Sequence, residues 1–354
     1  IISGRKRWIG LATIAQLAVI WARTEDGVRG FVVPTDSPGF AATAIEPKFA
    51  MRASIQCDIE LAGVRLPADA ILLAVDEPGA EITKPLATDP AVRLIDYTGS
   101  STFGTWLRAN ARQAQLFTEE TGVNSIVITA TDNFDGMCAN LAFSLSLYSG
   151  QMCTAPQNIY VPQGGIAADQ GHKSFDQVAA GLAAAIDTLL ADPKQAAGIC
   201  GAIANPATRD RVEQARAQGR VIRDGTPLLL AVDAETPVAQ DECFGPVGFV
   251  IPCADADDGI ARATELAATN GAITAALYDT DDARIGRAVR AFARAGVNLS
   301  VNLTGNIFVN QSAAFSDFHV TGANPAGNAS LTDSAFVATR FRRVMWRRPA
   351  AVTV

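Results

Sequence analysis

The sequence contains few residues of the kinds that build metal centres, disulfide frameworks or membrane spans. Only two histidines occur, His172 and His319, and the six cysteines are scattered without a Cys-x-x-Cys pair. We therefore expect no metal site and no disulfide framework, and we interpret both histidines as ordinary polar residues. No apolar run reaches about 18 residues, and the N-terminal stretch lacks the pattern of a signal peptide. A cytoplasmic location without a membrane partner is predicted.

Positive charge is also scarce. The net charge is −7 and the isoelectric point is near 5.0, so phosphate backbones and anionic membranes are repelled and nucleic acid is not an expected partner. The exception is residues 340–348, where arginines alternate with Phe341, Val344 and Trp346. This stretch could bind phosphate, but the alternation favours a strand whose charged side faces water.

The remaining composition is that of a globular protein with more than one domain. The 354 residues are 49% hydrophobic and 18% charged, and a single core rarely grows beyond about 300 residues. Residues 17–21, 30–34 and 56–61 read as strands separated by turns, which predicts an antiparallel β segment. From about residue 74, apolar strands such as 125–128 alternate with helical stretches such as 177–190, which predicts an α/β fold with a parallel sheet.

Cys153 lies in the run Gly-Gln-Met-Cys-Thr-Ala-Pro, between a predicted helix (139–148) and a predicted strand (158–162). A thiolate is nucleophilic, and its adduct with an aldehyde can become a thioester once hydride leaves. Taken singly, each cysteine is better explained as a buried inert thiol. In this setting the run resembles the aldehyde dehydrogenase superfamily, whose nucleophile lies in a Gly-Gln-x-Cys-Thr loop. The resemblance covers most of residues 74–354.

The resemblance implies a general base upstream of Cys153. Glu120, Thr121 and Gly122 stand where the family has Glu-Leu-Gly-Gly, with one residue missing before Ser125. The family's glutamate activates the water that releases the acid, and a partly desolvated carboxylate suits that task. The alternative is that Glu120 is a surface acid beside Glu119.

Two further motifs imply cofactor contacts. Residues 242–246 match the family's Glu-x-Phe-Gly-Pro, in which Glu242 would hold the nicotinamide ribose hydroxyls and Phe244 would lie beside the nicotinamide. Residues 97–100 resemble its Phe-Thr-Gly-Ser, so Gly99 and Ser100 would meet the cofactor's pyrophosphate at a helix start. On its own, that turn is equally typical of a helix cap.

The function implied is oxidation of a small aldehyde to a carboxylic acid with NAD or NADP, by a homo-oligomer. Residues 120–125 and 322–330 look most like the phenylacetate-degradation type, which suggests aromatic catabolism. Two alternatives stay open: the chain is catalytically silent, or Cys153 and Glu120 hydrolyse esters without a redox cofactor.

Residues 1–72 resemble a different family, the middle β domain of acyl-CoA dehydrogenases, closest to the glutaryl-CoA type. The similarity lies in residues 4–10, 30–34, 52–54 and 64–67. The tryptophan matching Trp8 packs against flavin in that family, but Trp8 could equally be a core aromatic. FAD is not expected, because the family's helical domains have no counterpart here.

The expected division is 1–73 (β segment), 74–120 (partial NAD(P)-binding segment), 121–335 (catalytic domain) and 336–354 (C-terminal oligomerisation strand). The nicotinamide-binding part also reads as incomplete, since the family's oxyanion-hole asparagine is not found. We expect two partial domains from unrelated enzymes joined near residue 73. A natural fusion, an artificial chimera and an assembly of fragments all fit this sequence.

Overall fold

The chain divides into two compact units in the computed structural model, which describes residues 1–25, 27–46, 55–66, 82–203, 205–310 and 346–348. The first unit comprises Ile1–Ile95 with Leu107–Gln115, and the second comprises Asp96–Trp106 with Leu116–Val354. The predicted junction near residue 73, His319, residues 322–330 and the Trp8 side chain lie outside what is described.

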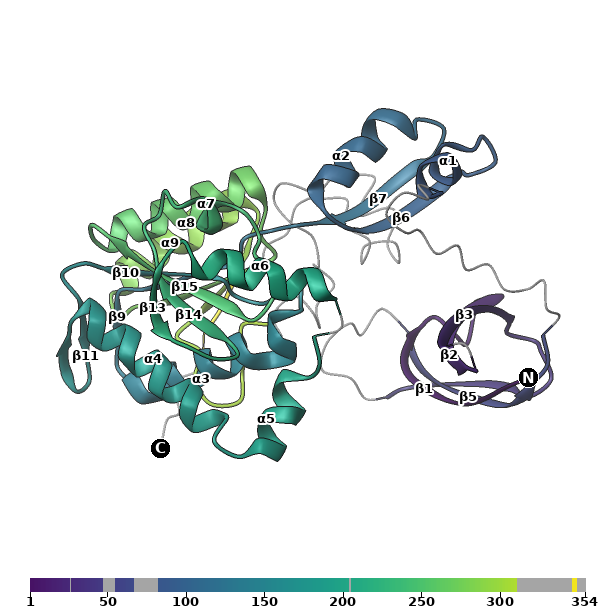
Figure 1. Cartoon of the computed structure of the whole chain (residues 1–354), viewed down its shortest axis with the longest axis horizontal. Helices are drawn as coiled ribbons and strands as arrows, with labels where there is room; N and C mark the ends of the chain where they lie inside the picture. The colour runs from purple at the N-terminus through teal and green to yellow at the C-terminus, as the bar shows by residue number, and fades with distance from the viewer. Residues whose placement is uncertain (26, 47–54, 67–81, 204, 311–345, 349–354) are drawn as a thin grey trace. The chain divides into compact units, whose positions relative to one another are not determined.

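The first unit begins with five antiparallel strands (Figure 1). They are β1 (Ile2–Gly10), β2 (Leu17–Thr24), β3 (Gly27–Pro34), β4 (Phe40–Ala44) and β5 (Gln56–Val64). Strand β5 lies between β1 and β4, while β2 and β3 form a separate pair. The buried side chains Ile20 and Val33 pack with Ile59 and Leu61 into one core. The predicted antiparallel β segment is confirmed.

A short α/β segment follows, made of α1 (Thr83–Thr88), β6 (Leu94–Gly99), α2 (Ser101–Asn110) and β7 (Gln115–Glu120). Strands β6 and β7 pair in a two-stranded sheet. The chain turns from β6 directly into α2.

Eight of the described strands form the main sheet of the second unit, in the order β13-β14-β15-β10-β8-β16-β17-β18. Their bounds are β8 (Ser125–Ile128), β10 (Asn158–Pro162), β13 (Arg220–Arg223), β14 (Leu228–Ala231), β15 (Val247–Cys253), β16 (Thr274–Tyr278), β17 (Asn298–Val301) and β18 (Trp346–Arg347). Only β13 runs antiparallel to its neighbour among these strands. The predicted parallel sheet is confirmed.

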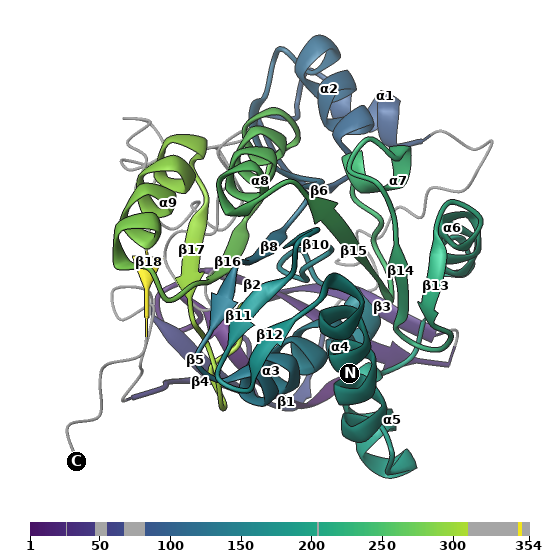
Figure 2. The same ribbon diagram turned by 90° about the vertical axis from the view of Figure 1, so that its left-hand side faces the viewer.

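Both faces of this sheet are buried at β14, β15, β10, β8 and β16, because alternate residues of each of these strands enter different cores. In β8, Val127 belongs to one core while Ile126 and Ile128 belong to the other. Helices α3 (Phe134–Ser146) and α4 (Phe175–Leu189) cover one face, and α8 (Ala256–Asn270) and α9 (Asp282–Ala295) cover the opposite face (Figure 2). Burial on both faces explains why these strands are continuous apolar runs.

Smaller elements connect these layers. They are β9 (Ala130–Thr131), the 3₁₀ turn η2 (Leu147–Gly150), β11 (Ile166–Ala168), β12 (Gly171–Lys173), α5 (Pro193–Cys200), α6 (Pro206–Arg216) and α7 (Pro237–Gln240). Within the described ranges, no helix has the length and apolar character needed to cross a bilayer. No group of three or more potential metal-ligating side chains occurs there either.

The described end of the basic C-terminal stretch is β18, which runs parallel to β17. Here the side chains have the reverse of the predicted orientation: Trp346 is 49% exposed, while Arg347 is half-buried. The Arg347 guanidinium donates to Ser300 Oγ at 3.3 Å and to the Phe308 carbonyl at 3.0 Å. These bonds let the arginine turn inward, which charge alternation could not reveal.

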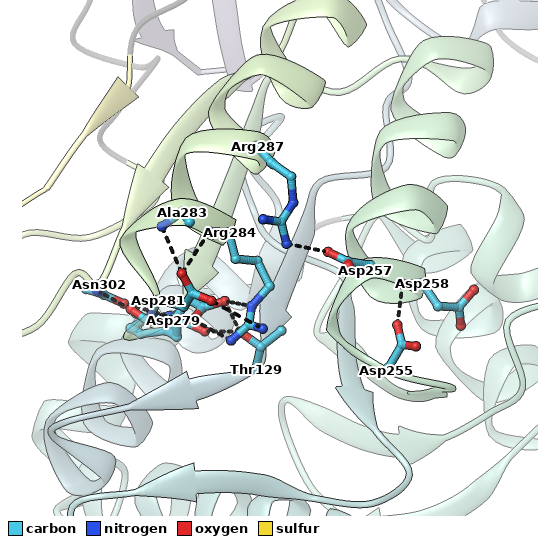
Figure 3. Close-up of polar contacts among 11 residues, drawn as sticks. Thr129, Asp255, Asp257, Asp258, Asp279, Asp281, Ala283, Arg284, Arg287 and Asn302 are labelled. Carbon is cyan, nitrogen blue, oxygen red and sulfur yellow. Dashed lines mark hydrogen bonds and ion pairs between the residues drawn. The ribbon is translucent and has the colours of Figure 1, made fainter.

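The carboxyl ends of β8, β16 and β17 meet at the buried side chain of Asp279 (Figure 3). Its carboxylate accepts from Thr129 Oγ1 at 2.6 Å and forms an ion pair with Arg284 of α9. Asn302 Nδ2 donates to the Asp279 carbonyl at 2.8 Å. Burial acts to raise the pKa of Asp279, but the bonds from Arg284, Thr129 and the Asp281 N–H outweigh it, so the pKa is lowered.

Candidate active site

Two predicted site residues, Cys153 and Glu242, lie together with Glu119 at the opposite side of the sheet, where the parallel strands begin. Glu119 precedes β8, Cys153 precedes β10, and Glu242 precedes β15. These three strands are neighbours and run parallel, with Asn158 opposite both Ser125 and Phe249. Their entry segments therefore converge, although they lie far apart in the sequence.

The loop that carries Cys153 has a tight backbone. Tyr148 (φ 52°), Ser149 (φ 54°) and Gly150 (φ 64°) are consecutive left-handed residues at the end of α3. A Cβ at Gly150 would collide with the Gly245 carbonyl, so both the conformation and the space require glycine there. The Ser149 hydroxyl donates to the Cys200 carbonyl at 2.8 Å. Left-handed non-glycine residues are costly and tend to occur at functional sites.

The Cys153 thiol is half-buried and forms a hydrogen bond with the Glu119 carboxylate. Burial chiefly, then the negative charges of Glu119 and Glu242, raise the pKa of this thiol far above its ordinary value. The thiol is therefore protonated at neutral pH in this state. Its nearest route to a thiolate is transfer of the proton to Glu119.

Glu120, the residue predicted to be the base, is directed elsewhere. Its carboxylate accepts from Thr118 Oγ1 at 2.9 Å and fills the space beside Gly104 of α2. Both glutamates belong to β7, and successive strand side chains point to opposite faces, so only one can face Cys153.

The sequence contained a signal for Glu119. If Gly122 is aligned with the second glycine of Glu-Leu-Gly-Gly rather than the first, Glu119 takes the glutamate position and no residue is missing before Ser125. Glu119, rather than Glu120, thus lies where its carboxylate can accept the thiol proton of Cys153.

The Glu242 carboxylate accepts a hydrogen bond from the Gly122 N–H. Burial, reinforced by the nearby Glu119 charge, raises the pKa of Glu242 to about 7, although this N–H and Arg211 act in the opposite direction. Arg211 Nη1 also donates to the Phe244 carbonyl at 2.8 Å. The structure therefore brings Glu242 and Phe244 to the same edge as Cys153.

The turn at Gly99 and Ser100 starts α2. Ser100 Oγ accepts from the Phe103 N–H at 3.3 Å, so this hydroxyl caps the helix. The next residue, Ser101, lies with its hydroxyl 2.5 Å from that of Thr121. The α2 start is thereby joined to the segment that carries Glu119 and Gly122.

A small pocket lies between the converging segments. Its lining includes Gly122, Gly150, Met152, Glu242 and Phe244. It combines backbone close to two glycines, one carboxylate and one aromatic ring, beside the loop of the candidate nucleophile.

Two buried amides hold this site together, and sequence reasoning missed both. Asn124 is 2% exposed and bonds to the Cys153 loop, and Gln157 is 5% exposed. Gln157 Oε1 accepts from the Cys243 N–H at 2.6 Å, and its Nε2 donates to the Asp241 carbonyl at 3.0 Å. Gln157 thus fixes the turn that carries Glu242. The sequence signal that could have indicated both residues is a polar amide directly before an apolar strand, as at Asn124 before β8 and Gln157 before β10.

Comparison with known proteins gives two family matches. The model of the aldehyde dehydrogenase family matches residues 59–327. The model of the acyl-CoA dehydrogenase middle domain matches residues 1–64.

Individual relatives agree with the first match. N-succinylglutamate 5-semialdehyde dehydrogenase from Burkholderia multivorans is 29% identical over 252 residues, which are 66% of this chain and 49% of that protein. The chain therefore spans about half the length of the curated relatives it matches.

Solved structures agree as well. The crystal structure of an NAD-dependent aldehyde dehydrogenase from Burkholderia multivorans is 49% identical, with a TM-score of 0.70, over 77% of this chain and 51% of that one. A 1-pyrroline-5-carboxylate dehydrogenase from Thermus with bound NAD is similar in fold, with 22% identity and a TM-score of 0.55, over 74% and 52% of the two chains.

Proposed function

Because the chain belongs to the aldehyde dehydrogenase family, we propose that it oxidises an aldehyde to a carboxylic acid with NAD or NADP, using Cys153 as nucleophile. The observation that carries the proposal is the hydrogen bond between Cys153 and Glu119 at the edge where Glu242 also lies. This contact pairs a thiol with the proton acceptor it needs.

The proposed chemistry uses the two residues in sequence. Glu119 takes the thiol proton, and Sγ of Cys153 bonds to the aldehyde carbon, giving a thiohemiacetal. A bound nicotinamide would supply the hydride acceptor, and loss of that hydride would leave a thioester on Cys153. Glu119 releases that proton to solvent and then takes a proton from the water that attacks the thioester; the C–S bond breaks, the acid departs, and Glu119 returns this second proton to the Cys153 thiolate.

The residues present fit a nicotinamide cofactor. A carboxylate has about four acceptor positions, and the Gly122 N–H occupies one on Glu242. The others can accept ribose hydroxyls, while Phe244 would contact the nicotinamide. Gly99 and Ser100 would meet the pyrophosphate through the first N–H groups of α2. The matched solved structures include NAD- and NADP-dependent dehydrogenases.

We further propose an aromatic aldehyde as substrate and a homo-oligomer as the active form. The substrate rests on the resemblance to the phenylacetate-degradation type, whereas the named curated relatives act on N-succinylglutamate 5-semialdehyde. Comparing kcat/KM for phenylacetaldehyde and for that semialdehyde decides between them. Higher kcat/KM for the semialdehyde would contradict the aromatic assignment.

The test of the reaction compares two cysteine variants. Cys153→Ala should abolish aldehyde-dependent NAD(P)H formation. Cys200→Ala, which removes another half-buried thiol, should retain it. Unchanged NAD(P)H formation by Cys153→Ala, or none by the wild-type protein, would contradict the proposal.

A further inference from the structure

We infer that the side-chain amide of Asn124 is the positioning group that holds Cys153 against Glu119. The inference rests on the proposed function, since it assigns Cys153 as the nucleophile. Asn124 follows Glu119 by a few residues and lies at the start of β8. One short segment would then carry both the base and the group that places the nucleophile.

The Asn124 amide makes four hydrogen bonds. Its Nδ2 donates to the Cys153 carbonyl at 2.8 Å and to the Ala155 carbonyl at 2.9 Å. Its Oδ1 accepts from the N–H groups of Ile273 at 2.9 Å and Thr274 at 3.0 Å. An amide offers two donors and two acceptor positions. The side chain is therefore saturated, and its orientation is defined on both sides.

The two halves of the amide serve different parts of the molecule. The oxygen joins β8 to the start of β16, which is structural support. The nitrogen binds the loop that contains Cys153, on both sides of Thr154. The second pair of bonds is the one that connects Asn124 to the loop of the nucleophile.

The Cys153 loop needs such a clamp, because it follows left-handed residues at Tyr148 and Ser149. Backbone bonds add to it: the Asn124 carbonyl accepts from the N–H of Gln157 at 2.9 Å and of Asn158 at 3.3 Å. Misplacing a reacting group by about 1 Å can cost about 100-fold in rate. The clamp thus acts on the distance between the thiol and its base.

Asn124→Asp tests the donor half of the amide by itself. An ionised carboxylate can still accept from the Ile273 and Thr274 N–H groups, but it cannot donate to the Cys153 and Ala155 carbonyls. Asn298→Asp is the matched control: Asn298 is also 2% exposed and donates to the Ile273 carbonyl at 3.2 Å from the start of β17. Asn124→Ser, which introduces no charge, is measured alongside as the variant that keeps the fold if a buried carboxylate does not.

The readout is the rate of iodoacetamide alkylation of each cysteine at pH 8, measured by peptide mass spectrometry. In Asn124→Asp, a loosened loop exposes Cys153 and separates it from Glu119, so its alkylation should rise at least about tenfold. The buried Cys138 and Cys253 report general loosening and should keep wild-type rates. In the same variant, kcat for aldehyde oxidation should fall about 100-fold with KM for NAD unchanged.

Asn298→Asp should leave Cys153 alkylation and kcat near wild type. Unchanged Cys153 alkylation in both folded Asn124 variants would overturn the assignment, as would equal acceleration at Cys138 and Cys253. If the wild-type protein oxidises no aldehyde, the proposed function fails while the alkylation comparison still judges Asn124.

Discussion

Two adjacent carboxylates at the end of β7 have different surroundings. Glu119 meets the Cys153 thiol, while Glu120 meets Thr118 and Gly104. The alternation of side chains along a strand causes the separation. Both residues are glutamates, so residue type cannot distinguish them. The face of β7 to which each side chain points determines which carboxylate can reach the Cys153 thiol.

Glu119→Gln should slow aldehyde oxidation by roughly 100- to 10,000-fold, because both the Cys153 thiol and the attacking water lose their base. Glu120→Gln should keep a rate near wild type, because the amide oxygen of Gln can still accept from Thr118 Oγ1. Steady-state NAD(P)H formation measures both variants. A greater loss of rate in Glu120→Gln than in Glu119→Gln would restore Glu120 as the base.

Glu242 makes stability depend on pH. Its pKa is about 7 in the folded chain, chiefly because of burial. The stabilising contribution of the neutral Glu242 side chain is therefore fully present below the pKa that this carboxyl has in the unfolded chain. It is lost as pH rises through about 7, where the buried carboxylate ionises. Glu242→Gln should therefore stabilise the chain at pH 8 relative to wild type, by up to about 3 kcal/mol, and little at pH 4.

Thermal unfolding of wild type and Glu242→Gln from pH 4 to pH 8 measures this. A difference in melting temperature that stays constant across the range would show that Glu242 ionises freely in the folded chain.

At the scale of the elements, the two ends of the parallel strands in the main sheet hold different clusters of side chains. The amino-terminal edge holds Glu119, Cys153 and Glu242, whereas the carboxyl edge is closed by the Asp279 and Arg284 pair (Figure 3). Asp279 is 0% exposed and its carboxylate has several partners. We interpret this second cluster as support for the fold.

Asp279→Asn should cost about 3 kcal/mol at pH 7, because it leaves Arg284 without its buried carboxylate. Asp282→Asn is the control on the same helix: Asp282 pairs with Arg348 at 2.7 Å, but its side chain is 82% exposed. Its loss should cost less than about 1 kcal/mol. Urea denaturation measures both, and equal costs would contradict the buried-pair interpretation.

The free-energy cost of Asp279→Asn also depends on pH. The pKa of Asp279 is lowered in the folded chain, so its contribution is present above the unfolded pKa and is lost as pH falls through the folded one. The cost of Asp279→Asn should therefore shrink in strong acid.

At the scale of the whole molecule, the two units contain separate hydrophobic cores. Ile59 lies in the core of the first unit, and Leu141 lies in a core of the second. The acyl-CoA dehydrogenase middle domain matches residues 1–64, which lie within the first unit. The aldehyde dehydrogenase match, residues 59–327, covers the remaining residues of that unit and most of the second. The finer division at residues 73, 120 and 335 stays a prediction.

Separate cores predict two unfolding transitions. Ile59→Ala should lower only the transition of the first unit, and Leu141→Ala only that of the second, each by roughly 2 to 5 kcal/mol. Differential scanning calorimetry resolves the two. One shared transition that both variants lower would show instead that the units unfold together.

Much of the fold could be read from local pattern. Strands β8 and β10 and helix α4 match the predicted segments closely, because apolar runs and helical periodicity depend on neighbouring residues. The run around Cys153 and the turn at Glu242 were likewise recognisable from short motifs, as was the α/β class. The sequence by itself thus determined the elements and the family.

Only the tertiary structure decided how the site is assembled. It directed Glu119 rather than Glu120 at Cys153, and it made Asn124 a partner of residues near both 153 and 273. It also turned Arg347 inward. Each of these outcomes depends on which parallel strands become neighbours, and contacts across a sheet join residues that local periodicity does not relate.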